Sequence, residues 1–303
     1  MVDILMATYN GEKYISEQLE SIIGQDFKDW KLFIRDDGSK DNTIHIIDNY
    51  MKKFPDKIEL IDNYNRNLGV KLNFGELMKR SKNQYCMFSD QDDVWLPNKI
   101  SITLNKMKEL EKVYDNKKPM LVHTDLKVVN QDLKLLNKSF FKYANIDPKR
   151  NTLNKLLVKN TVTGCTMMIN SKLRKVISEI PKECVMHDHW IALVASICGG
   201  IGFIDIPTIL YRQHGNNQVG ANSNSLLKKL IKHAKDFRYR FYTEQAEILY
   251  RSYSNFLNSK DSRIVKEFIQ LRRYNCIKKR YVIMKNNYFT NVMLNRIQMF
   301  LCC

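Results

Sequence analysis

Three carboxylates within four positions are spaced so that they could bind a divalent cation together. Asp90, Asp92 and Asp93 follow the apolar run Tyr85–Phe88, which we expect to form a buried strand, and precede Pro97, a favourable first residue for a helix. Carboxylates this close repel one another, and burying them unpaired would be costly. Mg²⁺ or Mn²⁺ would relieve the repulsion, because both take oxygen ligands and share them with phosphate groups. The alternative is a helix N-cap, with Asp92 or Asp93 as the capping residue.

The elements that position this loop alternate along the chain. Apolar runs predict strands at residues 4–8, 31–35, 58–61 and 85–88, and helical spacing predicts helices at 12–23, 41–51 and 72–78. This alternation indicates an α/β fold with a mostly parallel sheet and helices on both faces. Ligands of such sheets bind outside the carboxyl ends of the strands, where four polar clusters fall here. These clusters are Thr8–Asn10, Asp36–Ser39, Asn65–Gly69 and Ser89–Asp93.

The four clusters favour one nucleotide site over four unrelated turns. The sequence contains no Gly-x-Gly-x-x-Gly fingerprint and no Walker A motif, which excludes the usual dinucleotide and P-loop signatures.

Charge divides the chain into two parts. The protein has 303 residues and a net charge of +17, and residues 221–303 hold 17 Lys and Arg against 5 Asp and Glu. We therefore predict a body at residues 1–220 and a basic helical region at residues 221–303. The basic region calls for an anionic partner, either nucleic acid, an anionic membrane surface or an acidic polymer.

The cysteines and the N-terminus indicate a cytoplasmic protein. Seven scattered cysteines form no Cys-x-x-Cys pair, which favours neither a disulfide framework nor a zinc site. The N-terminus enters a strand directly, without the basic segment of a signal peptide. The longest uncharged apolar stretch, residues 191–204, is too short to span a bilayer, and we expect a buried helix and a strand there.

Four motifs carry a resemblance to a known family. Ala7–Gly11, Asp36–Thr43, Asn67–Gly69 and Ser89–Trp95 resemble the motifs of family-2 glycosyltransferases, in the family's order and within roughly residues 2–220. These enzymes have the GT-A fold and use nucleotide-sugar donors, so the resemblance implies both for this chain. The sequence of the acidic motif is most similar to that of bacterial rhamnosyltransferases of surface polysaccharide synthesis.

The resemblance implies a nucleotide site made of five side chains. Thr8 and Tyr9 would line the base and ribose, and Asp90 would reach the ribose. Asp36 would accept a hydrogen bond from the pyrimidine ring N–H, which selects uracil or thymine, and Asn67 would help to hold the nucleotide. A ring N–H needs a fixed acceptor, so the assignment to Asp36 is chemically sensible.

The resemblance also implies where the metal ion and the diphosphate lie. Asp92 would coordinate Mn²⁺ or Mg²⁺ at the diphosphate. The strand at 209–213 leads to Arg212 and His214, in the position where related enzymes bring such residues to the metal and the diphosphate. We expect Arg212 to stabilise the leaving group and His214 to reach the metal.

The acceptor side should come from the middle of the chain. Residues 163–169 read as a strand entered through Gly164, and with Cys165 this segment resembles the acceptor-facing part of the family. Asp188, at the start of an apolar helix, would be the catalytic base, and Trp190 would face the acceptor. An N-cap role for Asp188 is compatible with this. His187 stands where the family usually has a glutamate, which leaves the role of that position open.

The sequence therefore predicts an inverting, metal-dependent glycosyltransferase. It would move a sugar, with rhamnose favoured, from a dTDP- or UDP-linked donor to a glycan or lipid-linked glycan acceptor. The basic segment 228–240 would attach it to an anionic membrane surface. The alternatives are a nucleic-acid-binding protein that uses the basic region and a sugar nucleotidyltransferase. Clustered carboxylates at the ligand edge argue against a nucleic-acid partner.

Overall fold

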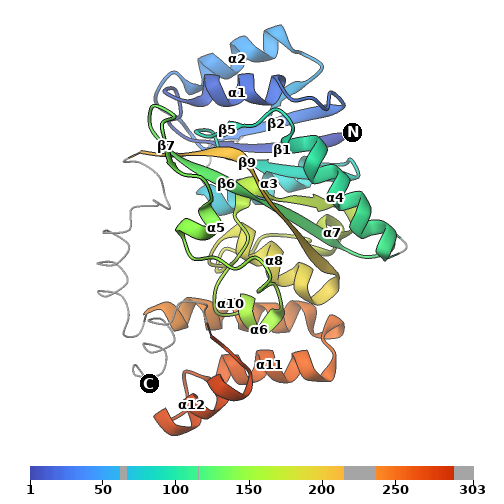
Figure 1. Cartoon of the computed structure of the whole chain (residues 1–303), viewed down its shortest axis with the longest axis vertical. Coiled ribbons are helices and arrows are strands. Elements are labelled where there is room, and N and C mark those ends of the chain that lie inside the picture. Colours follow the sequence, from blue (N-terminus) through green and yellow to red (C-terminus); the bar gives the residue numbers. More distant parts are fainter. Residues whose placement is uncertain (62–66, 115, 215–236, 290–303) are drawn as a thin grey trace.

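A computed structural model describes residues 1–61, 67–114, 116–214 and 237–289. The described chain contains one mixed sheet with helices on both faces and a group of C-terminal helices at one end (Figure 1). The N-terminal half alternates strand and helix as predicted. Its elements are β1 (Val2–Thr8), α1 (Ile15–Ile23), β2 (Trp30–Asp36), α2 (Thr43–Lys53), β3 (Ile58–Leu60), α3 (Val70–Arg80) and β4 (Tyr85–Ser89).

Parallel pairing brings the carboxyl ends of these four strands to one edge. β1 lies between β2 and β4, and β3 pairs with β2 on the outside. Thr8 is in register with Asp36, and Met6 is in register with Ser89. The polar residues that follow these strands therefore meet at one place, as the sequence predicts.

The second half adds antiparallel strands to the sheet. Its elements are β5 (Val94–Trp95), α4 (Lys99–Val113), β6 (Met120–Asn130), β7 (Leu135–Asn137), α5 (Phe140–Tyr143), α6 (Leu153–Leu156), η1 (Gly164–Thr166), β8 (Met168–Asn170), α7 (Ser171–Val176), α8 (His187–Cys198) and β9 (Gly200–Gln213). The path of the sheet is β3-β2-β1-β4-β8-β6-β9-β5, with β7 paired to β6. β8 runs antiparallel to both of its neighbours, and β6 pairs in parallel with β9.

β6 is one continuous strand that runs through a register shift beside β9. One local prediction is corrected in this half. The strand expected over 163–169 begins as the 3-10 turn η1, and only Met168–Asn170 joins the sheet. The turn forms because Thr166 N donates to Thr163 O, and Gly164 N donates to the Asp188 carboxylate instead of to a neighbouring strand.

Each face of the sheet has its own apolar core. On one face α1, α2 and α4 bury Leu19, Ile47 and Leu104 against the strands. On the other face α3 and α8 bury Phe74 and Ile191. Burial on both faces explains why the central strands are almost continuously apolar rather than alternating.

The C-terminal helices extend the second core. They are α10 (Phe237–Tyr253), the short turn η2 (Ser254–Phe256), α11 (Ser259–Gln270) and α12 (Cys276–Lys285). Leu249 and Phe268 belong to the same buried cluster as Trp190 and Ile191 of α8. The described helices therefore pack on the body. The predicted boundary at residues 220–221 and most of the predicted membrane segment 228–240 lie outside the described residues.

Among the described residues, no helix combines the length and the apolar character needed to cross a bilayer. The apolar stretch 191–204 divides into α8 and β9 at Gly199, as predicted. A Cβ at Gly199 would lie 1.7 Å from the Pro119 carbonyl oxygen, so only glycine permits this close approach.

Candidate active site

The loops after β1 and β2 are joined by hydrogen bonds. Asn10 N donates to Ser39 Oγ at 2.8 Å, and Lys40 N donates to Asn10 Oδ1 at 2.8 Å. Gly11 N donates to Thr43 Oγ1 at 2.8 Å, which fixes the first loop to the start of α2. Backbone groups at strand ends lack ladder partners, so these contacts give the edge a defined shape before any ligand binds.

Asp36 holds this edge together. Its carboxylate accepts from Thr8 Oγ1 at 2.8 Å, from Ser39 Oγ at 2.5 Å, and from the backbone N–H groups of Gly38 and Ser39 at 2.9 and 2.7 Å. A carboxylate has about four acceptor positions, and these four bonds occupy them. Asp36 is therefore built into the turn, and the predicted contact with a pyrimidine N–H requires a hydroxyl donor to move.

Asp37 holds the residues that precede α3 in the same way. It accepts from Leu68 N and Gly69 N, each at 2.8 Å, and Asn67 Nδ2 donates to the Asp37 carbonyl at 3.0 Å. Arg35 pairs with the Asp37 carboxylate at 3.1 Å in a buried position. The predicted nucleotide residue Asn67 thus lies beside the loop that contains Asp36.

Gln91 connects the acidic loop, residues 89–93, to the end of β1. Gln91 Oε1 accepts from Tyr9 N at 2.8 Å, and Gln91 Nε2 donates to Tyr9 O at 2.9 Å. This two-point contact leaves the Tyr9 side chain 49% exposed and available to a ligand. The sequence prediction did not assign Gln91 a role. The available signal was its position, because a neutral amide stands there between carboxylates.

The acidic loop is brought together with Asp188 and Cys165. One ligand atom each from Asp90, Asp93 and Cys165 lies within 4.8 Å of the others. Burial and the negative charges of Asp92 and Asp188 raise the pKa of Asp90 to about 7. Burial and the charges of Asp92 and Asp90 also raise the pKa of Asp93. The repulsion that the sequence predicts is therefore present in the fold.

Asp92 and His214 meet at the same edge. His214 Nε2 lies 2.8 Å from Asp92 Oδ2, and the His214 ring stacks on Tyr14 with 4.8 Å between the centroids. The two residues are 122 positions apart in the chain, and β9 carries His214 back beside β5 and the acidic loop. Their proximity agrees with the prediction that both bind one metal ion.

Arg212 lies beneath the acidic loop rather than at its open side. Its Nε donates to the Asp92 carbonyl at 2.8 Å, Nη1 to the Gln131 carbonyl at 2.5 Å and Nη2 to Glu17 Oε2 at 2.5 Å. The side chain is 1% exposed and packs over Tyr14. We therefore revise the predicted diphosphate contact, because the guanidinium is already used to hold the Asp92 backbone in place.

The residues present fit a divalent cation that prefers oxygen ligands. Asp93 Oδ2 is buried and has no hydrogen-bond partner among the described residues, and three carboxylates share one short loop. The Cys165 thiol is a poor addition to this set, because a soft sulfur ligand does not match a hard cation such as Mg²⁺ or Mn²⁺. Carboxylate oxygens with one imidazole suit Mg²⁺ or Mn²⁺.

Lys99 is a buried cation beside the acidic loop that the sequence prediction missed. It lies at the first position of α4, is fully buried, and packs over Trp95 with its Nζ 4.5 Å from the ring centroid. Burial lowers the pKa of Lys99 to about 8, and the neighbouring Asp93 opposes this shift. A positive charge behind the loop offsets part of the carboxylate repulsion.

Asp188 is held by backbone donors at the start of α8. Its Oδ1 accepts from His189 N at 2.6 Å and its Oδ2 accepts from Gly164 N at 3.2 Å. A hydrogen bond with the Asn160 side chain also favours the charged form. Burial is the largest influence, and it raises the pKa of Asp188 to about 6. An oriented carboxylate with this pKa is suited to accept a proton near neutral pH.

His187, at the position where the family usually has a glutamate, faces away from the solvent. Its ring packs against Phe74 and Phe88, with centroids 4.2 and 5.9 Å away. Neither ring nitrogen has a partner among the described residues, and burial lowers the pKa of His187 to about 3. The residue is therefore neutral and supports the turn at Gly164, where a Cβ would lie 2.9 Å from His187 Nε2.

Gln245 of α10 clamps the segment that carries Asp188. Its Oε1 accepts from Val185 N at 2.9 Å, and its Nε2 lies 3.3 Å from His189 Nδ1. His189 Nε2 lies 2.6 Å from the Leu156 carbonyl, so Nε2 carries the proton and Nδ1 accepts from Gln245. This contact reaches across 56 residues, and the sequence offered no periodicity or motif to reveal it.

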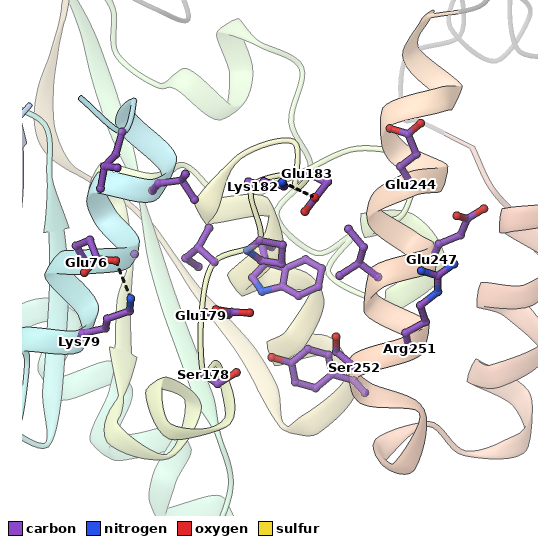
Figure 2. A pocket seen from close by; sticks show the side chains of 18 residues that line it. Glu76, Lys79, Ser178, Glu179, Lys182, Glu183, Glu244, Glu247, Arg251 and Ser252 are labelled. Carbon is purple, nitrogen blue, oxygen red and sulfur yellow. Dashed lines mark hydrogen bonds and ion pairs between the residues drawn. The ribbon is translucent and has the colours of Figure 1, made fainter. Parts of the chain in front are cut away.

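Trp190 belongs to the core and not to the acceptor side. It is 1% exposed, and its ring contacts Tyr253 of α10 with 5.9 Å between the centroids. Trp190 and Tyr253 also line a groove of about 700 Å³ between α3, residues 178–183 and α10. Figure 2 shows charged side chains of α3 and α10 along this groove. The predicted role of Trp190 is therefore revised, because its ring is buried against α10.

Two curated relatives of the chain are glycosyltransferases by name. The chain is 32% identical over 228 residues to the dTDP-rhamnosyl transferase RfbG of Shigella flexneri, which covers 72% of this chain and 74% of the relative. It is 26% identical over 171 residues to the UDP-Glc:alpha-D-GlcNAc-diphosphoundecaprenol beta-1,3-glucosyltransferase WfgD of Escherichia coli, which covers 56% of this chain and 59% of that one.

Solved structures share the fold. TarS 1-349 of S. aureus, in complex with UDP-GlcNAc, has a TM-score of 0.59 at 16% identity and covers 99% of this chain and 79% of its own. The mannosyltransferase PcManGT of Pyrobaculum calidifontis, in complex with GDP-Man and Mn²⁺, has a TM-score of 0.53 at 12% identity and covers 99% and 86%. The predicted GT-A-like fold is thus confirmed. Residues 3–177 match the family model for glycosyl transferase family 2, and the chain belongs to this family of glycosyltransferases.

Proposed function

We propose that the chain is an inverting, divalent-metal-dependent glycosyltransferase of cell-surface polysaccharide synthesis, with a dTDP- or UDP-sugar as donor. A rhamnose donor is favoured, because a dTDP-rhamnosyl transferase is 32% identical across most of the chain. A glycan or lipid-linked glycan is the proposed acceptor, and the diphosphoundecaprenol acceptor named for the relative WfgD supports the lipid-linked form.

One observation carries the mechanism: a base-like carboxylate and a cluster of metal-ligand carboxylates occupy the same edge of the sheet. Asp188 is near enough to Asp90 for its charge to raise the pKa of Asp90. A donor sugar bound with its diphosphate at Asp92 and His214 would therefore place its anomeric carbon within the same small region as Asp188. This is the geometry that a displacement at that carbon requires.

In the chemical step one proton is transferred, and a bond to the acceptor oxygen replaces the bond to the diphosphate oxygen. The acceptor oxygen forms a bond to the anomeric carbon as the bond from that carbon to the diphosphate oxygen breaks. Asp188 takes the acceptor hydroxyl proton, and attack from the side opposite the nucleotide inverts the configuration. Gly164 N and His189 N hold the two Asp188 oxygens in fixed directions during this step.

The leaving diphosphate needs positive charge more than the acceptor needs a base. Asp92 and His214 would hold the cation, and Arg212 fixes the backbone carbonyl of Asp92 from beneath. When bound, the cation supplies charge neutralisation at the diphosphate. Thr8, Tyr9, Asp36, Asn67 and Asp90 remain the proposed nucleotide residues, and Tyr9, the aromatic residue among them, is exposed and accessible for stacking on the base.

A donor panel tests the proposal directly. We expect nucleoside diphosphate release from dTDP-rhamnose, measured beside several UDP-sugars with Mn²⁺ present. Asp92→Ala should abolish the Mn²⁺-dependent part of dTDP or UDP binding in calorimetry, whereas the exposed control Asp132→Ala should bind normally. Unchanged affinity of Asp92→Ala with and without Mn²⁺ would refute the metal assignment.

The same assays separate the alternatives. A sugar nucleotidyltransferase would release pyrophosphate from a nucleoside triphosphate and would leave nucleotide-sugar donors intact. A nucleic-acid-binding protein would show steeply salt-dependent binding to DNA or RNA and no release of nucleoside diphosphate.

A further inference from the structure

The outermost C-terminal helix has two apolar faces, and the body covers only one of them. α12 buries Val282 and Ile283 in the core that it shares with α11. Its other apolar residues, Ile277, Tyr281 and Met284, are 81%, 62% and 59% exposed. Figure 1 shows α12 at the end of the molecule, beyond α11. We call these three exposed residues the outer stripe.

The outer stripe is continuous on one side of the helix. A helix turns about 100° per residue, so positions 277, 281 and 284 fall within roughly 60° of one another. Val282 and Ile283 point to the opposite side, which explains why both faces can be apolar without conflict. Exposing three large apolar side chains in a row to water is unfavourable, and such a surface usually marks a contact.

Cations border the outer stripe on both sides. By the same helical geometry, Lys278 and Lys285 lie on one flank and Arg280 lies on the other. Lys285 also pairs with Glu267 of α11 at 2.7 Å, so part of its charge is balanced within the protein. The sequence of α12 contains no Asp or Glu. Described residues 237–289 as a whole hold 12 Lys and Arg against 4 Asp and Glu. The outer face of α12 therefore combines an apolar centre with positively charged margins.

We propose that the outer stripe of α12 lies in the headgroup region of an anionic lipid surface. The apolar side chains would enter the acyl boundary, and the flanking cations would meet the lipid phosphates, as in interfacial amphipathic helices. Charge complementarity selects this occupant, because a stripe that pairs with a second copy would bring the same cations together. The proposal deepens the proposed function, since a lipid-linked acceptor is found at such a surface.

Vesicle co-sedimentation of the full chain tests the proposal. We expect binding to phosphatidylglycerol-containing vesicles at 0.1 M salt, weaker binding at 0.5 M salt, and little binding to phosphatidylcholine alone. The combined variant Ile277→Ser, Tyr281→Ser, Met284→Ser should reduce the partition on the order of 100-fold. Val113→Ser, at an exposed apolar position on α4, is the matched control and should bind as the unaltered protein does.

A second readout guards against general loss of structure. The exposed Cys276 begins α12 and can carry a polarity-sensitive dye once Cys302, Cys303 and the partly exposed Cys198 are replaced by serine. We expect a blue shift of its emission with anionic vesicles, and dTDP or UDP affinity that is unchanged in the stripe variant.

Equal vesicle binding by the stripe variant and the unaltered protein, or no binding by either, would overturn the proposal. So would a dimer in light scattering that the stripe variant loses. Because nucleotide binding is measured separately, these outcomes leave the donor proposal intact.

Discussion

At the scale of single residues, the environment of Asp188 separates its role from those of the other carboxylates. Asp36 accepts from backbone and hydroxyl donors, and Asp37 accepts from backbone donors and the Arg35 guanidinium, so both are structural in the free protein. Burial and neighbouring carboxylates raise the pKa values of Asp90 and Asp93, so a cation at this loop would relieve their repulsion. Asp188 is oriented by two N–H donors and has a pKa raised to about 6 by burial, which leaves it ionised and basic at neutral pH.

We predict that Asp188→Asn lowers turnover by roughly 10²–10⁴-fold and leaves donor affinity nearly unchanged. The amide keeps the shape of the side chain but cannot accept the proton.

In the unaltered enzyme, turnover should rise with pH through about 6 and then level, because only the ionised carboxylate acts as a base. Steady-state rates from pH 5 to 8 at fixed Mn²⁺ measure this. An acid limb centred near pH 4, or turnover of the variant within a few-fold of normal, would place the base elsewhere.

At the scale of elements, α10 helps to fix the segment that carries the proposed base, Asp188. Gln245 is 1% exposed and bonds residues on both sides of Asp188, namely Val185 and His189. His189 in turn contacts the carbonyl of Leu156 at the end of α6. The start of α8 is thus fixed from two directions, and Gln245 acts as a positioning residue.

Gln245→Ala should lower turnover at least tenfold while donor affinity stays within about twofold. The change leaves Val185 N without its acceptor and frees the His189 ring, at a cost of about 1–3 kcal/mol for the buried N–H. Kinetics that separate kcat from KM, with Gln270→Ala on α11 as the control, test this. Equal losses in donor affinity and turnover would indicate a structural effect alone, and normal turnover would show that the clamp is dispensable.

At the scale of the whole molecule, the C-terminal helices share a core with the catalytic body. Phe268 of α11 and Leu249 of α10 lie in one buried cluster with Trp190 and Ile191 of α8. Removing the region would expose this cluster, so the predicted division at residue 220 describes charge and composition better than it describes independent folding.

We predict that Phe268→Ala, at a side chain that is 1% exposed, destabilises the full chain by about 3–5 kcal/mol. Phe256→Ala, at a side chain that is 52% exposed, should change stability little. Urea unfolding followed by far-UV circular dichroism and by nucleotide binding measures both variants. The two signals should shift together in Phe268→Ala. Nucleotide binding that persists at the original urea concentration would show that the C-terminal helices unfold separately.

The sequence alone determined the order of strands and helices in the first half, the fold class and the glycosyltransferase family. These depend on local patterns, because apolar periodicity fixes which backbone conformation buries a segment, and the four motifs follow strand ends in a set order. The family resemblance also assigned Asp92 and His214 to a metal ion and Asp188 to the acceptor proton, and these roles stay predictions.

Only the tertiary structure decided which of these residues meet and which of their donors and acceptors remain available. The sequence assigned Arg212 to the diphosphate, yet in the fold its guanidinium donates to Glu17 and to the carbonyls of Gln131 and Asp92. It assigned Trp190 to the acceptor, yet packing against α10 buries it. Gln245 and His189 carry no local signal because their contact depends on how α10 docks on α8. Hydrogen bonds between distant segments form only after packing sets the distances, and a pattern within one segment cannot encode them.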